Sequence, residues 1–572
     1  MLWLLPLFRP ARRELALVEA LLLLGSGASV VASLGMGWAI DAASGGGGIG
    51  WILGGALAYA GLVVVSAGLT WVARTRIERV SQTAMLALKE RLFSHLLRHD
   101  IALHDRIGAG ALLARVSGDI EAMRLLFSEV ILQLPGDIAL VAGMFVVLGV
   151  TAPHLALIVA STVPLWVGLV AWYRWVSPAA FAEVRSQSAT LSGWMAESVA
   201  AIPLLRTMDR LDFAREHTAA LGRARFGADL RYGLQSVWFF NGLFGVRAAV
   251  LGAVVWVGAE EVAEKTLTAG VLLVAVDYVR KMVEPFLRLQ FHITTLERAR
   301  VGAARVKDLL DTAREVVDPT DPLHWDGIIG PFTLADVSFA YDSGPPVFEH
   351  VSLTIAAGKR TAFVGPTGGG KSTLVQLLAR FRDPSAGVVA MDGRDLRRFA
   401  LADLRTDIGL VTQSVQLLPG TVAENLGIDP QHTGTLLREV GLDRRLSAAT
   451  RVGAGGETLS RGEAQLLCVA RALAHEPDVL LLDEATSAMD PDTEARVMAL
   501  LAARPGRTVV AVAHRLKTVA AFDHIIVIDH GVVEQGTHAE LLAAKGVYAG
   551  LWAAQAAREG LPARVGAGRE AR

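Results

Sequence analysis

The C-terminal half of this chain is built around the sequence Gly365-Pro366-Thr367-Gly368-Gly369-Gly370-Lys371-Ser372-Thr373. It fits the pattern GxxxxGK[ST], in which glycines let backbone N–H groups close around phosphates. A strand-like run (361–364) precedes it and an apolar, helix-like run (374–378) follows, which is the context that a phosphate-binding loop requires. We therefore expect this loop to bind ATP, with Lys371 contacting the phosphates and the Ser372 hydroxyl as a ligand for Mg²⁺.

The composition points to a membrane protein. The chain has 572 residues, of which 52% are hydrophobic and only 19% charged, against about 25% charged in typical soluble domains. The formal net charge of −1 gives no overall field that would attract nucleic acid. Cys468 is the only cysteine, so no disulfide can form within the chain.

The N-terminal half contains apolar runs long enough to cross a membrane, which takes about 20 residues. The runs 20–40 and 42–72 carry no charge, and the uncharged run 138–173 is long enough for two spans joined near residues 151–154. The runs 235–258 and 267–287 are less clean because charged residues interrupt them. We predict six membrane-spanning helices rather than the buried helices of a soluble protein.

Basic residues in the loops set the orientation. The segment 74–127 holds nine Lys and Arg residues and the segment 174–234 holds eight, whereas the three loops on the other side hold one, Lys265. Both long segments, both termini and the ATP-binding half are therefore expected in the cytoplasm, in a multi-pass protein of the inner (plasma) membrane.

The expected domains follow from these patterns. Residues 1–317 form a six-helix transmembrane domain whose helices extend into the cytoplasm and turn near 101–112 and 205–213; separate surface helices are the alternative. Residues 318–330 form a linker, because two prolines break any helix there. Residues 331–555 form an α/β nucleotide-binding domain of the P-loop type, and residues 556–572 a disordered tail.

Further residues of the C-terminal half fit an ATP site. Tyr341, about 24 residues before the loop, is placed to stack on adenine, although an ordinary strand tyrosine is equally consistent. The aliphatic run 479–482 ends in Asp483 and Glu484, which fits a buried strand that brings one carboxylate to Mg²⁺ and another to the attacking water. His514 follows another strand-like run and is within reach of the γ-phosphate, or it is structural.

Together these motifs resemble an ATP-binding cassette (ABC) transporter, specifically an exporter-type half-transporter, over roughly residues 10–555. The resemblance assigns Gln413 to Mg²⁺ contact and to sensing of the membrane domain, and Asp490 to a loop that crosses a dimer. It assigns the sequence Leu459-Ser460-Arg461-Gly462-Glu463 to the family signature. It also gives catalytic roles to Lys371, Glu484 and His514.

The resemblance implies a mechanism that needs two cassettes. Each of two ATP molecules lies between the phosphate loop of one cassette and the signature of the other. Closure on ATP shifts the membrane helices and hydrolysis resets them. A chain with one membrane domain and one cassette must therefore pair with a second half-transporter.

The signature departs from the usual LSGGQ of the family. Arg461 replaces a glycine and Glu463 replaces glutamine. We infer that the chain favours a heterodimer with one degenerate ATP site, with a homodimer as the alternative.

The membrane half gives fewer clues to what is transported. Arg247 and Asp277 are expected at similar depth in their spans, and we predict that they pair or bind a polar substrate together. The resemblance implies export of a hydrophobic or amphipathic small molecule, in contact with membrane lipid. Import with an exporter fold, for instance of a metal–siderophore complex, and an ATP-binding regulatory or channel subunit remain alternatives.

Overall fold

The structure is a computed structural model that describes residues 2–559 except 326, 328, 329, 342, 343, 485–488, 490, 503–505 and 514. The chain divides into two compact units, which are described separately. The first comprises Met1–Arg98 and Ala109–Thr312, and the second comprises His99–Gly108 and Ala313–Arg572. The short segment His99–Gly108 therefore belongs with the C-terminal half by its contacts, although it lies between two long helices of the N-terminal half in sequence.

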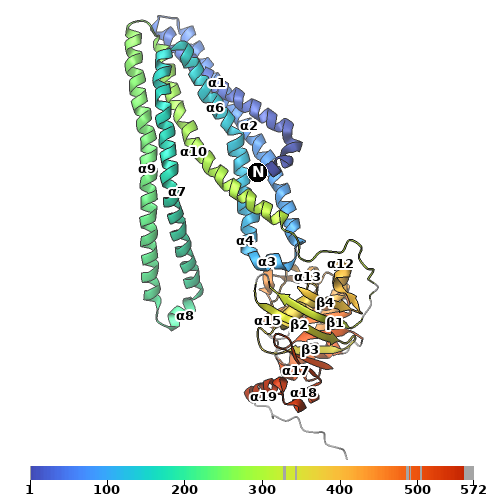
Figure 1. The fold of residues 1–572 in the computed structure, drawn as a ribbon. Coiled ribbons are helices and arrows are strands. Elements are labelled where there is room, and N and C mark those ends of the chain that lie inside the picture. The colour runs from blue at the N-terminus through green and yellow to red at the C-terminus, as the bar shows by residue number, and fades with distance from the viewer. Residues whose placement is uncertain are drawn as a thin grey trace, which may run out of the picture. The chain divides into compact units, whose positions relative to one another are not determined.

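The first unit is entirely helical (Figure 1). Its helices are η1 (Leu2–Ala11), α1 (Arg12–Ser44), α2 (Ile49–Leu97), α4 (Ala109–Ala114), η2 (Arg115–Asp119), α5 (Ile120–Leu125), η3 (Leu126–Ile131), α6 (Gln133–Thr151), α7 (Pro153–Ala200), α8 (Ile202–Thr207), α9 (Leu211–Ala263) and α10 (Ala269–Asp311).

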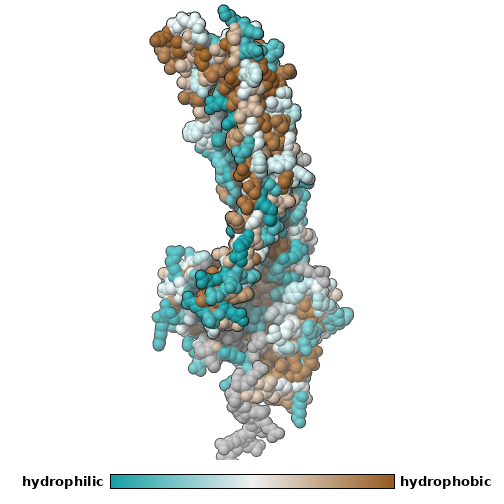
Figure 2. Space-filling model, turned by 90° about the vertical axis from the view of Figure 1, so that its left-hand side faces the viewer, coloured by the Kyte–Doolittle hydropathy of each residue, from teal (hydrophilic) through white to brown (hydrophobic). Residues whose placement is uncertain are grey.

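Five of these helical stretches are long and apolar enough to cross a membrane: Pro6–Ser44, Ile49–Leu97, Ala109–Thr151, Pro153–Ala200 and Leu211–Ala263. Helix α10 corresponds to the sixth predicted span; it has 43 residues, but charged residues interrupt its apolar part. Large apolar side chains such as Leu57 and Trp256 are mostly exposed on the long helices, and Figure 2 shows apolar side chains spread along this unit. A lipid environment is where such side chains are stable.

Three helices of the first unit are much longer than a membrane span. Helix α2 has 49 residues, α7 has 48 and α9 has 53. At 1.5 Å per residue each is about 70–80 Å long, more than twice the roughly 30 Å hydrocarbon core of a bilayer. Helices α7 and α9 lie side by side and are joined through α8 (Figure 1).

The second unit contains two main sheets. Its strands are β1 (Phe332–Ala340), β2 (Pro346–Ile355), β3 (Arg360–Val364), β4 (Ala386–Met391), β5 (Arg394–Asp395), β6 (Ile408–Val411), β7 (Gly420–Thr421), β8 (Arg451–Val452), β9 (Val479–Asp483), β10 (Thr508–Val512), β11 (His524–Ile528) and β12 (Val532–Gly536). An antiparallel sheet has the order β2-β1-β4-β5, and a six-stranded sheet has the order β12-β11-β3-β10-β9-β6.

Helices pack around these sheets. They are α3 (Ile101–Ile107), α11 (Lys371–Leu378), η4 (Leu396–Arg398), α12 (Leu401–Thr406), α13 (Val422–Leu426), α14 (Pro430–Val440), η5 (Ala454–Gly456), α15 (Arg461–Leu473), α16 (Pro491–Ala502), α17 (Leu516–Val519), α18 (His538–Ala544) and α19 (Val547–Glu559). Helix α19 includes residues 556–559, the start of the predicted disordered tail; the rest of that tail, 560–572, lies outside the described residues.

The topology of the larger sheet positions the site. Strands β11, β3, β10, β9 and β6 are parallel neighbours, and both β9 and β10 are almost fully buried. The carboxyl ends of parallel strands meet at one edge of a sheet, which is where ligands bind in open α/β folds. The phosphate loop follows β3, Asp483 ends β9, and Gln413 follows β6, so all three reach the same edge.

Candidate nucleotide site

The phosphate loop joins β3 directly to the N-terminus of α11. Gly370 has a φ of +99°, and a Cβ atom there would lie 2.4 Å from the Phe348 ring. Only glycine fits both this backbone conformation and this close approach. The loop therefore presents its N–H groups and the positive end of the α11 dipole to the same point, an arrangement that binds phosphate.

Lys371 is the buried cation of the loop. Its side chain is 5% exposed, and its ammonium group donates hydrogen bonds to the carbonyl oxygens of Gly365 (3.0 Å) and Pro366 (2.7 Å). Burial lowers the pKa of Lys371 below its ordinary 10.5, although the charges of Glu484, Asp483 and Asp529 oppose that shift. A triphosphate beside Lys371 would favour its charged form.

Oxygen-bearing side chains meet next to Lys371. The Ser372 hydroxyl donates a hydrogen bond of 2.9 Å to Asp483 Oδ1, and Gln413 Nε2 donates one of 2.6 Å to Glu484 Oε2. A hydroxyl, a carboxylate and an amide oxygen are hard ligands of the kind that Mg²⁺ prefers. The donor set therefore fits the Mg²⁺ site predicted at Ser372, Gln413 and Asp483.

Glu484 leaves the sheet in an unusual conformation. Its φ is +52°, in the left-handed region that costs a residue other than glycine roughly 1–3 kcal/mol. The turn occurs directly after β9 and lets the Glu484 side chain line the nucleotide cavity. Such strain is often retained where a side chain must be held in a functional position.

Tyr341 follows the end of β1 and reaches the same cavity. Its hydroxyl lies 2.8 Å from Thr373 Oγ1 in α11, and its ring meets Phe339 edge-on at a centroid distance of 5.0 Å. The guanidinium carbon of Arg382 lies 4.7 Å from the centre of the Tyr341 ring. The ring is thus fixed at the mouth of the phosphate loop.

These residues enclose a cavity of about 340 Å³. Nine predicted site residues line it together with Val347, which the sequence analysis did not single out: Tyr341, Thr367, Gly368, Gly370, Lys371, Ser372, Thr373, Gln413 and Glu484. Gly365, Pro366, Gly369 and Asp483 belong to the same loop and strand end. His514 and Asp490 lie outside the described residues.

The signature forms the N-terminus of α15. Ser460 caps the helix, and its backbone N–H donates a hydrogen bond of 2.9 Å to the Glu463 carboxylate in a capping box. Arg445 forms an ion pair with the same carboxylate. Burial alone would raise the pKa of Glu463, but the Ser460 hydrogen bonds and the Arg445 charge hold it below its ordinary 4.5. Glu463 is therefore a charged residue with a structural partner, and Arg461 is exposed beside it.

The predicted pair in the membrane helices does not form. Asp277 forms an ion pair with Lys281 at 2.8 Å and accepts a hydrogen bond from Ser33, whereas Arg247 lies against the Phe244 ring. Lys281 is four residues from Asp277 on the same helix, so it reaches the carboxylate without help from another helix. The pairing of Arg247 with Asp277 was therefore a wrong prediction.

A phosphate loop with two carboxylates at the same edge of a parallel sheet, in a chain that also carries long apolar helices, is the organisation of an ATP-driven membrane transporter. The family model for the ABC transporter transmembrane region matches residues 15–286, and the ABC transporter model matches residues 348–487. A fatty acid ABC transporter ATP-binding/permease protein of Mycobacterium tuberculosis is 33% identical over 86% of this chain and 80% of that protein.

Two further comparisons agree. An ATP-dependent lipid A-core flippase of Syntrophus aciditrophicus is 28% identical over 85% of this chain and 83% of its own length. A solved structure of a bacterial Atm1-family ABC exporter with ATP bound has a TM-score of 0.79 and 25% identity, and the match covers 95% of this chain and 99% of that one.

The chain belongs to the ABC transporter family and has the organisation of an exporter half-transporter. It binds ATP, couples ATP hydrolysis to transport, and works as a dimer as half-transporters do. It is a multi-pass protein of the inner membrane with its ATP-binding domain in the cytoplasm.

Proposed function

We propose that this protein exports an amphipathic small molecule with an acidic group, as one half of a heterodimer with one degenerate ATP site. The observation that carries the substrate class is a cavity of about 680 Å³ within the first unit. Leu22, Leu140 and Trp71 give it an apolar lining, and charged side chains give it a polar one. An amphipathic molecule satisfies both parts of such a lining.

The charges of this cavity favour an acidic group. Three cationic side chains (Arg74, Lys281, Arg288) and two acidic ones (Asp137, Glu284) line it. Arg288 already pairs with Asp137 at 3.2 Å and Lys281 with Asp277 at 2.8 Å. Arg74 is therefore the lining cation for which the described residues offer no ion pair, and it is the one that an acidic group would meet. Two relatives are named for fatty acid transport and for lipid A-core flipping, and a fatty acid is amphipathic and acidic. The proposed substrate class has the same chemistry.

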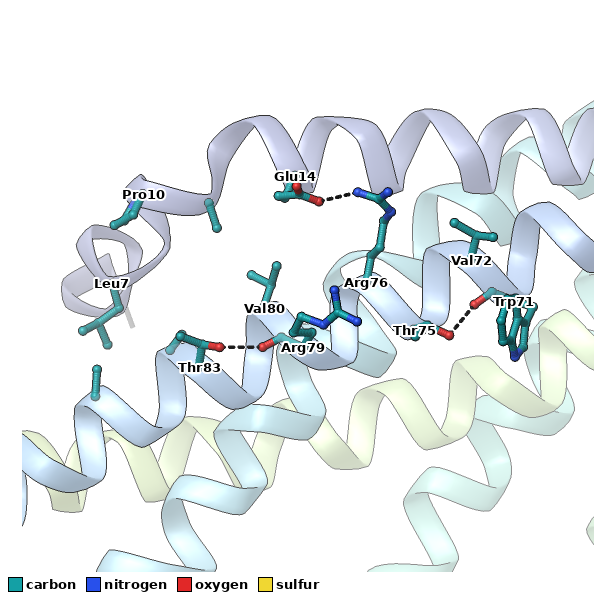
Figure 3. Close-up of a pocket in the computed structure, with 13 residues that line it drawn as sticks. Leu7, Pro10, Glu14, Trp71, Val72, Thr75, Arg76, Arg79, Val80 and Thr83 are labelled. Carbon is teal, nitrogen blue, oxygen red and sulfur yellow. Dashed lines mark hydrogen bonds and ion pairs between the residues drawn. The ribbon is translucent and has the colours of Figure 1, made fainter.

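A second groove supports contact with membrane lipid. It measures about 570 Å³ and lies between the N-terminal part of the chain and α2. Figure 3 shows Trp71 and Val72 from the end of the apolar run, with Arg76 turned toward Glu14 and Arg79 nearby. Tryptophan and arginine at the end of a span are typical of the membrane–water interface.

The nucleotide site supports hydrolysis by residues of this chain. Lys371 and the loop N–H groups hold the phosphates, Tyr341 stacks on adenine, and Glu484 polarises the attacking water. Gln413 orients the Glu484 carboxylate through the bond at 2.6 Å. Ser372, Gln413 and Asp483 would hold Mg²⁺, which neutralises phosphate charge when bound. The family resemblance adds His514 at the γ-phosphate and Asp490 at the dimer interface.

Substrate-stimulated ATPase activity tests the substrate class. The full chain, with its partner if one is needed, is assayed in lipid nanodiscs with oleate and with oleyl alcohol as a neutral match. Oleate is expected to stimulate hydrolysis more than the alcohol, and Arg74→Gln to reduce the difference. Equal stimulation by both compounds would contradict the acidic group. Glu484→Gln serves as the inactive control.

The mass and activity of the purified chain test the heterodimer. A monomeric or inactive chain supports a missing partner, whereas an active dimer whose rate does not respond to Arg461→Gly contradicts the degenerate site. A matched control is Arg444→Gln, which removes one exposed positive charge elsewhere in the cassette.

A further inference from the structure

Arg382 is a buried cation close to the nucleotide cavity. It follows α11, and its side chain is 6% exposed. Its Nε atom is buried without a hydrogen-bond partner among the described residues. A buried charge is costly unless other groups compensate for it, so the groups that face Arg382 decide what it does.

One compensating group is Tyr341, whose ring centre lies 4.7 Å from the Arg382 guanidinium carbon. A cation at this distance from an aromatic ring is attracted to it, and more strongly where water is excluded. The Tyr341 hydroxyl is held at the same time by Thr373 in α11. Arg382 therefore fixes the ring that lines the nucleotide cavity without lining that cavity itself.

The other compensating group is Asp105 of α3. Arg382 Nη2 donates a hydrogen bond of 2.7 Å to Asp105 Oδ2. Asp105 is 56% exposed, so it can lose this bond without leaving an unpaired buried carboxylate. Helix α3 has a second attachment, because Asp100 accepts hydrogen bonds from the backbone N–H groups of Glu315 and Val316. Its covalent neighbours on both sides are helices of the first unit.

We propose that Arg382 is a positioning residue that links adenine recognition to the attachment of α3. It holds the Tyr341 ring for stacking with its guanidinium face and holds Asp105 with its guanidinium edge. Because one cation makes both contacts, docking of α3 is expected to strengthen the binding of ATP. By thermodynamic linkage, bound ATP then strengthens the docking of α3 by the same factor. This inference rests on the proposed role of Tyr341 in stacking on adenine.

The test separates base recognition from phosphate recognition. The full chain carrying Glu484→Gln is placed in lipid nanodiscs, and dissociation constants are measured for MgATP and for magnesium tripolyphosphate, which has no base. Arg382→Gln and Asp105→Asn are each expected to weaken MgATP binding about two- to thirtyfold, the range for a cation–π contact from exposed to desolvated sites. Neither variant is expected to change the affinity for tripolyphosphate. An unchanged affinity for tripolyphosphate also shows that the phosphate loop is still folded.

A double variant and two controls complete the design. Arg382→Gln combined with Asp105→Asn is expected to weaken MgATP binding no more than Arg382→Gln alone, because both act through one contact. Arg106→Gln, an exposed residue on the same helix, is expected to have no effect. Unchanged MgATP affinity in Asp105→Asn, or additive losses, would overturn the link. If Tyr341→Ala keeps its MgATP affinity, the proposed stacking itself fails.

Discussion

Replacing Arg445 with glutamine would leave the Glu463 carboxylate without its cationic partner at the N-terminus of α15. In the wild-type chain Arg445 pairs with Glu463, and the family places this signature against the ATP held by the partner cassette. We expect the KM for ATP of the assembled transporter to rise while kcat stays nearly unchanged, because the added repulsion acts on binding of the triphosphate.

The size of the effect follows from Coulomb's law. A unit charge roughly 10 Å from another in water contributes about 0.4 kcal/mol, and MgATP carries about two net negative charges, which gives about 0.8 kcal/mol. That is a rise of about fourfold in KM. Loss of the ion pair itself is expected to lower the free energy of unfolding by only about 0.2–1 kcal/mol, because Arg445 is 68% exposed and water screens the pair.

Steady-state ATPase assays in lipid nanodiscs measure this effect. Arg445→Gln combined with Glu463→Gln removes both charges and is expected to restore the wild-type KM, and high salt is expected to reduce the difference. The matched control is Arg444→Gln, an exposed neighbour. A KM that rises equally in the double variant would show that Arg445 acts through packing or folding, and the electrostatic reasoning would be refuted.

Three further outcomes follow from the site and the membrane helices. Gly370→Ala is expected to abolish MgATP binding in an equilibrium titration, because the new Cβ would lie 2.4 Å from the Phe348 ring; binding at wild-type affinity would contradict this. Burial lowers the pKa of Lys371 in the nucleotide-free protein, and a bound triphosphate favours its charged form, so MgATP binding is expected to take up protons at a pH between that lowered pKa and the ordinary 10.5; calorimetry in two buffers of different ionisation enthalpy measures this. Lys281→Met is expected to destabilise the helical unit by about 1–3 kcal/mol, since it leaves the mostly buried Asp277 carboxylate with its Ser33 hydrogen bond but without its cation. Lys281→Met combined with Asp277→Asn is expected to recover most of that loss in thermal unfolding.

The sequence predicts that the phosphate loop, Gln413 and Glu484 meet at one cavity, because the motifs that carry them are local. The phosphate loop needs only a strand, nine residues and a helix, and the buried run before Asp483 can form only a central strand. Ser460 and Glu463 also stand at the spacing of a capping box, a signal that would have predicted the pairing of Glu463 before the structure.

Contacts between distant segments could not be predicted in this way. Arg382 and Asp105 are 277 residues apart in sequence, and neither belongs to a motif. Depth along a helix suggested that Arg247 and Asp277 meet, but depth does not give the direction of a side chain around the helix axis. Lys281, one helical turn away, forms the ion pair with Asp277 instead.

The position of the signature explains why this chain needs a second cassette. No signature residue is among the described residues that line its own nucleotide cavity, so Ser460 and Arg461 have to act on nucleotide held elsewhere. Arg461→Gly is therefore expected to leave the MgATP affinity of the separated chain unchanged and to alter hydrolysis only after assembly. In a chain that also carries Glu484→Gln, two quantities can be measured: the MgATP affinity of the separated chain and the amount of nucleotide trapped in the assembled dimer. A change in the affinity of the separated chain would mean that Arg461 acts on the nucleotide site of its own cassette, which contradicts the proposed division of each site between two chains.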